Sequence, residues 1–185
     1  MRVLGISGSL RRDSHNSRLL RAAGALLPPG VELVVYDALK AVPPYDADDD
    51  EPGREPAAVR DFKAAIAGAD AVLIATPEYN ASIPGQLKNA LDWASRPIAT
   101  NVLRNKPAAV IGASTGMFGA VWAQAELRKV LSTIGARVID RELPVGGADD
   151  AFTRAGELAD GDLQLELRGI VAELVAETCP QPVAA

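Results

Sequence analysis

After Met1 and Arg2 the chain reads Val3-Leu4-Gly5-Ile6-Ser7-Gly8-Ser9-Leu10-Arg11-Arg12-Asp13-Ser14-His15-Asn16-Ser17. Its short apolar run predicts a buried strand, and apolar residues return at helical spacing from Leu19 to Leu27. Between them lies a polar loop, and Ser14, Asn16 and Ser17 are candidate caps of the helix that follows. Unpaired backbone N–H groups and the positive end of the helix dipole converge at such a helix start. This segment therefore predicts an anion site.

The side chains of this loop favour phosphate as the anion. Hydroxyl and amide donors come from Ser9, Ser14, Asn16 and Ser17. Arg11 and Arg12 add positive charge. The only histidine, His15, is either a further contact for the phosphate or an exposed loop residue, and the second is expected. The loop matches neither the Walker pattern nor G-x-G-x-x-G, so a capped turn without a ligand remains the alternative at this point.

Length and composition indicate a single globular domain, which we expect to span residues 1–178 and to be followed by a flexible tail, 179–185. The net charge of −5 argues against nucleic-acid binding. The sequence has no apolar run long enough to cross a membrane and no secretory signal, and its one cysteine, Cys179, fits a reducing compartment. We therefore expect a cytoplasmic protein with no membrane or nucleic-acid partner and no metal site.

Further apolar runs alternate with helical patterns along the chain. Strands are expected at 31–36, 70–76, 108–113 and 137–140, and helices at 56–68, 86–95, 120–134 and 160–177. Residues 37–56 are expected to be irregular, with a solvated acidic run at 46–51. Alternation of this kind predicts an α/β fold: a flavodoxin-like, doubly wound, five-stranded parallel sheet of order 2-1-3-4-5 in a three-layer α/β/α arrangement.

That topology brings three polar loops together. Ligands of such sheets bind beyond the carboxyl ends of the strands, where the strand order reverses, which here is between the first and third strands. The loops at that place are 7–14 and 77–82, with 114–119 beside them. Their convergence favours a ligand site over a capped turn.

Two motifs are similar to those of the NADPH-dependent FMN reductase family, which includes bacterial quinone and chromate reductases. The first is Gly8-Ser9-Leu10-Arg11 followed by Ser14, Asn16 and Leu19. The second runs from Pro77-Glu78-Tyr79-Asn80 through Ser82 and Pro84-Gly85 to Leu87-Lys88-Asn89-Ala90, Asp92-Trp93 and Ser95-Arg96. Gly112-Ala113-Ser114-Thr115-Gly116 also resembles the third flavin-contacting loop of the family.

The resemblance implies an enzyme that binds FMN, takes hydride from NADPH or NADH, and passes it to a quinone, free flavin, azo dye or chromate. It also implies a homodimer or homotetramer with the flavin close to the subunit interface. The implied phosphate ligands are Ser9, Arg11, Ser14, Asn16 and Ser17. The implied ring contacts are Pro77, Glu78, Tyr79 and Asn80, with Ser114, Thr115 and Gly116 from the third loop.

Because the flavin carries the hydride chemistry, we expect no catalytic side chain. Tyr79 is a candidate gate over the ring, or else a packed loop residue. Lys88 and Asn89 are expected to support the loop, and Trp93 to pack in the core or at an interface. Glu78 is assigned no catalytic role.

Two other functions remain open on the sequence alone. One is a flavodoxin-type electron carrier without an NADPH step, and the other is a flavin-free signalling or scaffold domain on the same fold. The choice between NADPH and NADH also stays open, since Arg12, Arg18 and Arg104 are all candidates for contact with a 2′-phosphate.

Overall fold

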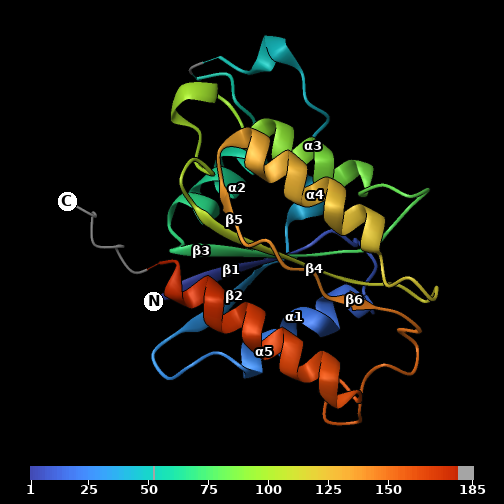
Figure 1. The fold of residues 1–185 in the computed structure, drawn as a ribbon. Coiled ribbons are helices and arrows are strands. Elements are labelled where there is room, and N and C mark those ends of the chain that lie inside the picture. The colour runs from blue at the N-terminus through green and yellow to red at the C-terminus, as the bar shows by residue number, and fades with distance from the viewer. Residues whose placement is uncertain (52, 179–185) are drawn as a thin grey trace.

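A parallel sheet in the order β2-β1-β3-β4-β5 forms the centre of the computed structural model, which describes residues 1–51 and 53–178 (Figure 1). Its strands are β1 (Arg2–Ser7), β2 (Glu32–Tyr36), β3 (Ala71–Thr76), β4 (Pro107–Ala113) and β5 (Arg137–Val138). The predicted strand order and fold class are confirmed. The predicted tail, 179–185, lies outside the described residues.

Within the described part of the chain, five α-helices cover the two faces of the sheet, and Figure 1 shows α1 and α5 on one face and α2, α3 and α4 on the other. Their bounds are α1 (His15–Ala25), α2 (Ala57–Ala67), α3 (Gly85–Ala94), α4 (Val121–Ile134) and α5 (Gly161–Ala176). Short 3-10 helices occupy Leu39–Ala41, Ala47–Asp49 and Ile98–Thr100. The three-layer arrangement expected from the alternation of strands and helices is therefore present.

Alternate side chains of the central strands supply two separate cores. Val72 and Ile74 of β3 join the core under α2, α3 and α4, whereas Leu73 joins the core under α1 and α5. All residues of β3 and β4 are buried, as expected for parallel strands with helices on both sides. The continuous apolar runs seen in the sequence have this cause.

The structure differs from the prediction after β4. The predicted fifth strand, 137–140, is shorter and ends at Val138. A sixth strand, β6 (Pro144–Val145), lies within the predicted loop 141–150 and pairs in parallel with the end of β4. Only two residues long and containing a proline, β6 has no apolar periodicity from which it could be predicted.

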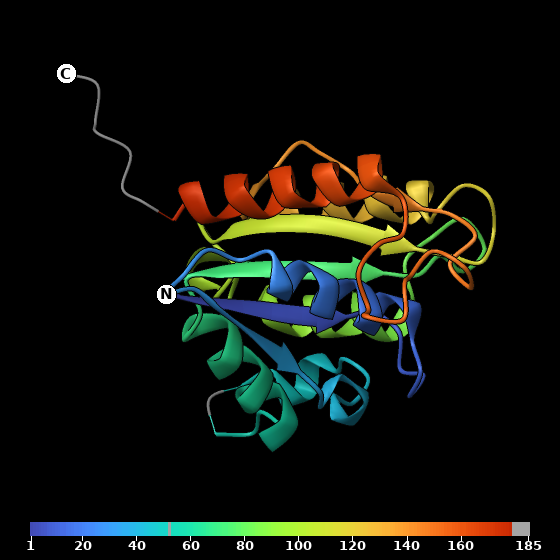
Figure 2. The ribbon, with the colours of Figure 1, turned by 90° about the horizontal axis from the view of Figure 1, so that it is seen from below.

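The parallel strands all end at one edge of the sheet. In Figure 2 the strand arrows point to one side, where the loops after β1, β3 and β4 gather, and the amino terminus lies at the other side. The three polar loops singled out in the sequence therefore share the carboxyl edge.

Candidate functional site

A pocket of about 260 Å³ lies between these three loops. It is lined by nine of the predicted site residues, namely Ser9, Arg11, Ser14, Asn16, Pro77, Glu78, Tyr79, Ser114 and Thr115. His15 and Ala113 complete the lining. Three predicted residues do not line the pocket: Ser17, in the first turn of α1, and Asn80 and Gly116, in the second and third loops.

The first loop is built to receive an anion. Ser14 caps α1, because its hydroxyl oxygen accepts hydrogen bonds from the backbone N–H groups of Asn16 and Ser17 at 3.2 and 3.4 Å. Several loop N–H groups meet no acceptor within the described chain: those of Leu10, Arg12, Asp13, Ser14 and His15. The exposed Arg11 side chain likewise makes no ion pair or hydrogen bond to the described residues. Unpaired donors and a positive charge thus surround the helix start.

Asn16 has a second task besides lining the pocket. Its buried side chain donates to the carbonyl oxygen of Ala113 and accepts from the N–H of Ala113, both at 2.9 Å. This pair of bonds ties the start of α1 to the end of β4. Ser17 is similarly engaged, since its hydroxyl lies 3.1 Å from that of Ser7. Both predicted phosphate ligands therefore also hold the loops in place.

His15 is not the exposed loop residue expected from the sequence. It is the first residue of α1, and only 14% of its side chain is exposed. Its Nε2 lies 3.2 Å from the Asp149 carboxylate, and its buried Nδ1 has no partner in the described structure. No motif in the sequence indicates this contact, because Asp149 lies in the segment after the unpredicted strand β6.

The second loop contains a tight turn. Tyr79 and Ser82 exchange two backbone hydrogen bonds, at 3.0 and 3.1 Å, around Asn80 and Ala81. Both central residues have positive φ, +54° and +59°, as a type I′ turn requires. For an alanine this backbone costs about 1–2 kcal/mol. The turn leaves the Tyr79 side chain 55% exposed at the pocket.

Two carboxylates attach this second loop to α4. Glu78 accepts a hydrogen bond from the N–H of Ala123 at 3.0 Å, in the first turn of α4, where Ala120 supplies no side-chain cap. In return, Glu126 of α4 accepts from the N–H of Ile83 at 3.3 Å. The Glu78 carboxylate thus acts as a helix cap.

The third loop packs closely against the segment after β5. A Cβ on Gly119 would lie 2.3 Å from the backbone carbon of Pro144, and one on Gly146 would lie 2.4 Å from the Met117 oxygen. The buried Gln124 side chain adds hydrogen bonds to Gly119 and to both backbone groups of Leu143. The sequence analysis did not single out Gln124, a polar residue on the apolar face of a predicted helix.

Exposed apolar side chains cluster at the end of the third loop and in the first turn of α4. Met117 is 81% exposed, and the rings of Phe118 and Trp122 meet edge to face with centroids 5.0 Å apart. Because Trp122 lies beside Ala123, to which Glu78 is bonded, this apolar surface adjoins the second loop. We call Met117, Phe118 and Trp122 the aromatic surface.

Lys88 and Asn89, which were expected to support the second loop, make other contacts instead. Asn89 binds Tyr45 and the Pro43 carbonyl oxygen, which also accepts from the fully buried Trp93. Lys88 pairs with Asp92 one helical turn later. Trp93 is thus a core residue, and Asn89 holds the segment around Pro43 instead of the loop after β3.

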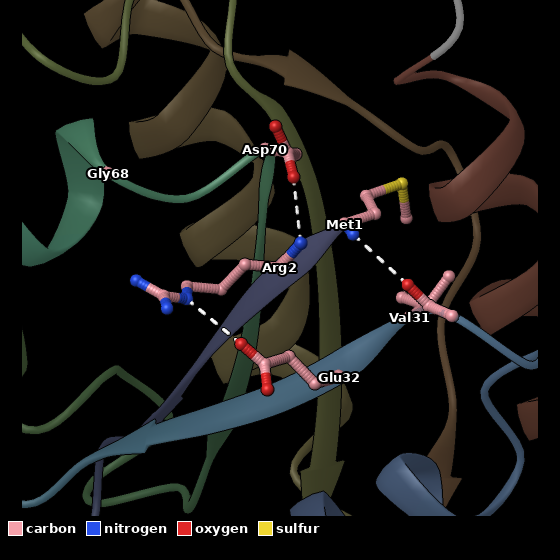
Figure 3. A pocket seen from close by; sticks show the side chains of 7 residues that line it. Met1, Arg2, Val31, Glu32, Gly68 and Asp70 are labelled. Atoms are coloured by element: carbon pink, nitrogen blue, oxygen red, sulfur yellow. Dashed lines mark hydrogen bonds and ion pairs between the residues drawn. The ribbon is translucent and has the colours of Figure 1, made fainter.

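A larger hollow, about 520 Å³, lies at the opposite, amino edge of the sheet (Figure 3). Its polar groups already bind one another: the Met1 ammonium group donates to Gly30, and Arg2 bonds to Asp70 through its backbone and to Glu32 through its side chain. Since ligands of such sheets bind at the carboxyl edge, we assign the site to the smaller pocket. Arg104 also lies at the amino edge, where it lines a separate hollow with Lys106, far from that site.

The donor set fits a flavin mononucleotide. Unpaired N–H groups and Arg11 suit a terminal phosphate, while the open pocket between the second and third loops suits a flat ring. Among residues 1–51 and 53–178 no three His, Cys, Asp or Glu side chains are grouped to hold a metal ion. Within those same ranges no helix is long and apolar enough to cross a membrane.

Comparisons with known proteins identify the family of the chain. A family model described as NADPH-dependent FMN reductase matches residues 1–150. Over 161 residues the chain is 45% identical to an NAD(P)H-dependent FMN reductase of Pseudomonas aeruginosa, with 86% of this chain and 85% of that protein covered. Over 130 residues it is 47% identical to a 2-hydroxy-1,4-benzoquinone reductase of a Burkholderia species, with 70% and 69% covered.

A solved structure extends the similarity to nearly the whole chain. The flavoenzyme NAD(P)H:(acceptor) oxidoreductase FerB of Paracoccus denitrificans superposes with a TM-score of 0.83 at 36% identity, and 96% of each chain is covered. The family expected from the two sequence motifs is therefore confirmed. This chain belongs to the NADPH-dependent FMN reductase family.

Proposed function

We propose that the chain is an FMN-dependent NAD(P)H oxidoreductase that passes hydride from NAD(P)H through FMN to a quinone or another small acceptor. The observation that carries this proposal is a set of N–H groups and the Arg11 side chain that have no partner among the described residues and lie at the pocket between the three loops. Family membership and the names of the relatives support it.

In this proposal the three loops divide the work of holding FMN. The start of α1, with Ser9, Arg11 and Ser14, would bind the phosphate. The backbone of Pro77, Glu78, Tyr79 and Asn80 would line the ring. Ser114, Thr115 and Gly116 would contact the ring or the ribityl chain, and Asn16 and Ser17 would contribute mainly by fixing the first loop.

Bound FMN would supply the hydride acceptor and donor atom, and the chain would supply position and electrostatics. Backbone N–H groups of the second and third loops would stabilise the negative charge that collects on the reduced ring. The rigid I′ turn at Asn80 and Ala81 holds the second loop in one shape, and the exposed Tyr79 would gate the open face.

The nicotinamide and the acceptor would use the same opening in turn, because the first loop closes the phosphate end. NAD(P)H would leave before a quinone enters, which gives ping-pong kinetics with parallel double-reciprocal plots. Of the three arginines considered for NADPH selectivity, Arg104 lies at the wrong edge. Arg18 stacks over the Phe152 ring at 4.6 Å, which leaves the exposed Arg12 as the candidate.

We also propose a homodimer or homotetramer in which the aromatic surface is covered by a second copy. Three large apolar side chains beside the pocket are a costly surface to leave in water. Light scattering of the purified chain should give two or four times the 19.3 kDa mass of the chain. The cytoplasmic location stays a prediction, which cell fractionation would test.

The test of the function combines binding and turnover. Apoprotein should bind FMN more tightly than riboflavin, because riboflavin lacks the phosphate. With FMN and NADPH the protein should then reduce a quinone, free FMN, an azo dye or chromate. The relative rates identify the preferred acceptor. A protein that binds FMN but leaves NADPH unoxidised would instead be an electron carrier.

A further inference from the structure

One polar group beside the phosphate end has no role in the function proposed above. His15 is the only histidine of the chain, and it lines the pocket as the first residue of α1. Its Nε2 contacts Asp149 at 3.2 Å, while its Nδ1 is buried without a partner in the described structure. Most of the ring is enclosed, so this arrangement is a feature of the fold and not of a free surface side chain.

In neither protonation state does the Nδ1 atom of this imidazole have a partner among the described residues. A neutral ring that donates Nε2–H to Asp149 leaves Nδ1 as an unpaired acceptor, and a charged ring leaves Nδ1–H as an unpaired donor. A phosphate bound at the same helix start would change the balance, because it places a second anion next to the ring. The charged ring is then favoured between the phosphate and the carboxylate.

The other charged groups around the pocket do not take the place of His15 between the phosphate and the Asp149 carboxylate. Arg11 lies across the first loop, and exposed Arg12 and Asp13 lie at its tip. The Glu78 carboxylate is bonded to α4, and Arg18, one turn further along α1, is stacked over Phe152. Asp150 follows Asp149 but makes no ion pair with His15.

We propose that His15 takes up a proton from solvent when the terminal phosphate of FMN binds, and that it holds the phosphate as an imidazolium oriented by Asp149. The proposal rests on the proposed function, since it assumes that the phosphate binds at the start of α1. It makes FMN binding dependent on pH. Affinity for FMN falls as pH rises above neutral, whereas affinity for riboflavin, which has no phosphate, does not.

A single histidine permits a direct observation. In the untagged, uniformly ¹⁵N-labelled wild-type chain, the imidazole nitrogen resonances belong to His15 alone. We expect them to shift toward the imidazolium form on addition of FMN at about pH 7.5 and to stay unchanged with riboflavin. Calorimetry in two buffers of different ionisation enthalpy should show proton uptake with FMN alone. These measurements need no variant, so they do not depend on the folding of a mutant.

Substitutions at His15 and Asp149 provide a second test of the proposal. His15→Gln should weaken FMN binding about tenfold at pH 6.5, remove its pH dependence between about pH 6.5 and 9, and leave riboflavin affinity within about twofold. Asp149→Asn, which acts through His15, should show a smaller loss and less proton uptake. Asp150→Asn removes the same charge from the next residue, and we expect it to bind FMN as the wild type does.

The outcomes separate this proposal from the proposed function. Tight FMN binding without proton uptake or a change of the His15 resonances would overturn the role of His15 and leave the flavin site intact. Equal losses in Asp149→Asn and Asp150→Asn would mean a general charge effect, which also overturns it. If neither FMN nor riboflavin binds, both proposals fail.

Discussion

The two edges of the sheet carry similar polar side chains and use them differently. At the amino edge Arg137 donates to the Glu177 carbonyl oxygen at 2.6 Å, and Arg2 bonds to Glu32 at 3.2 Å. At the carboxyl edge Arg11 and a run of loop N–H groups have no partner in the described chain. The fold itself satisfies the polar groups of the amino edge, so unpaired donors, more than pocket size, distinguish the functional edge.

The largest expected difference between the edges is the loss of stability when a glycine with positive φ is replaced by alanine. A Cβ on Gly119 would lie 2.3 Å from Pro144, whereas one on Gly30 would meet nothing within 4 Å. We expect Gly119→Ala to lower the free energy of unfolding by about 2–4 kcal/mol and Gly30→Ala by only about 1–2 kcal/mol. Urea unfolding of both variants measures this, and equal losses would show that the third loop can relax.

The next largest effect compares two arginines. Arg11→Ala should weaken FMN binding roughly 10- to 150-fold, because a charge-assisted bond to phosphate contributes about 1.5–3 kcal/mol. The matched control is Arg104→Ala at the amino edge, whose affinity for FMN should be unchanged. Fluorescence titration of the apoproteins provides both values. An unchanged affinity in Arg11→Ala would place that side chain in solvent in the complex.

A smaller effect is expected from the turn in the second loop. Ala81 has φ of +59°, which glycine adopts without strain. Ala81→Gly should raise the free energy of unfolding by about 0.5 kcal/mol, since the relief of strain exceeds the added entropy of the unfolded chain. Thermal unfolding would show a higher midpoint. A lower midpoint would mean that contacts of the alanine methyl group outweigh the strain.

The smallest expected effect is a pH dependence of the free energy of unfolding, which is caused by Lys106 at the amino edge. Burial lowers the pKa of Lys106 below its ordinary 10.5, and nearby Asp70 opposes this in part. The folded chain therefore releases this proton at lower pH than the unfolded chain, so the stability of the wild type rises as pH increases toward that value. Relative to Lys106→Met, the wild type should gain free energy of unfolding as pH rises from neutral toward 10.5. A constant difference would contradict this.

Features that depend on residues close together in the chain could be predicted from the sequence. Continuous apolar runs predicted β3 and β4, Ser14 was recognised as a cap from its place before a helical pattern, and loop composition predicted the pocket. Contacts between distant segments were not predictable. The bond between His15 and Asp149 depends on β6, whose two residues leave no periodic signal, and Glu78 caps a helix that starts 43 residues later. Such contacts depend on the fold and have no sequence motif of their own.

The most direct test of the central claim is an anaerobic absorbance titration of the FMN-loaded chain with NADPH. If the carboxyl edge holds FMN by its phosphate and leaves the ring open to nicotinamide, one equivalent of NADPH will bleach the flavin absorbance, and a quinone will restore it. Flavin that stays oxidised in the presence of NADPH would contradict the account, because the pocket would then bind FMN without giving nicotinamide access to the ring.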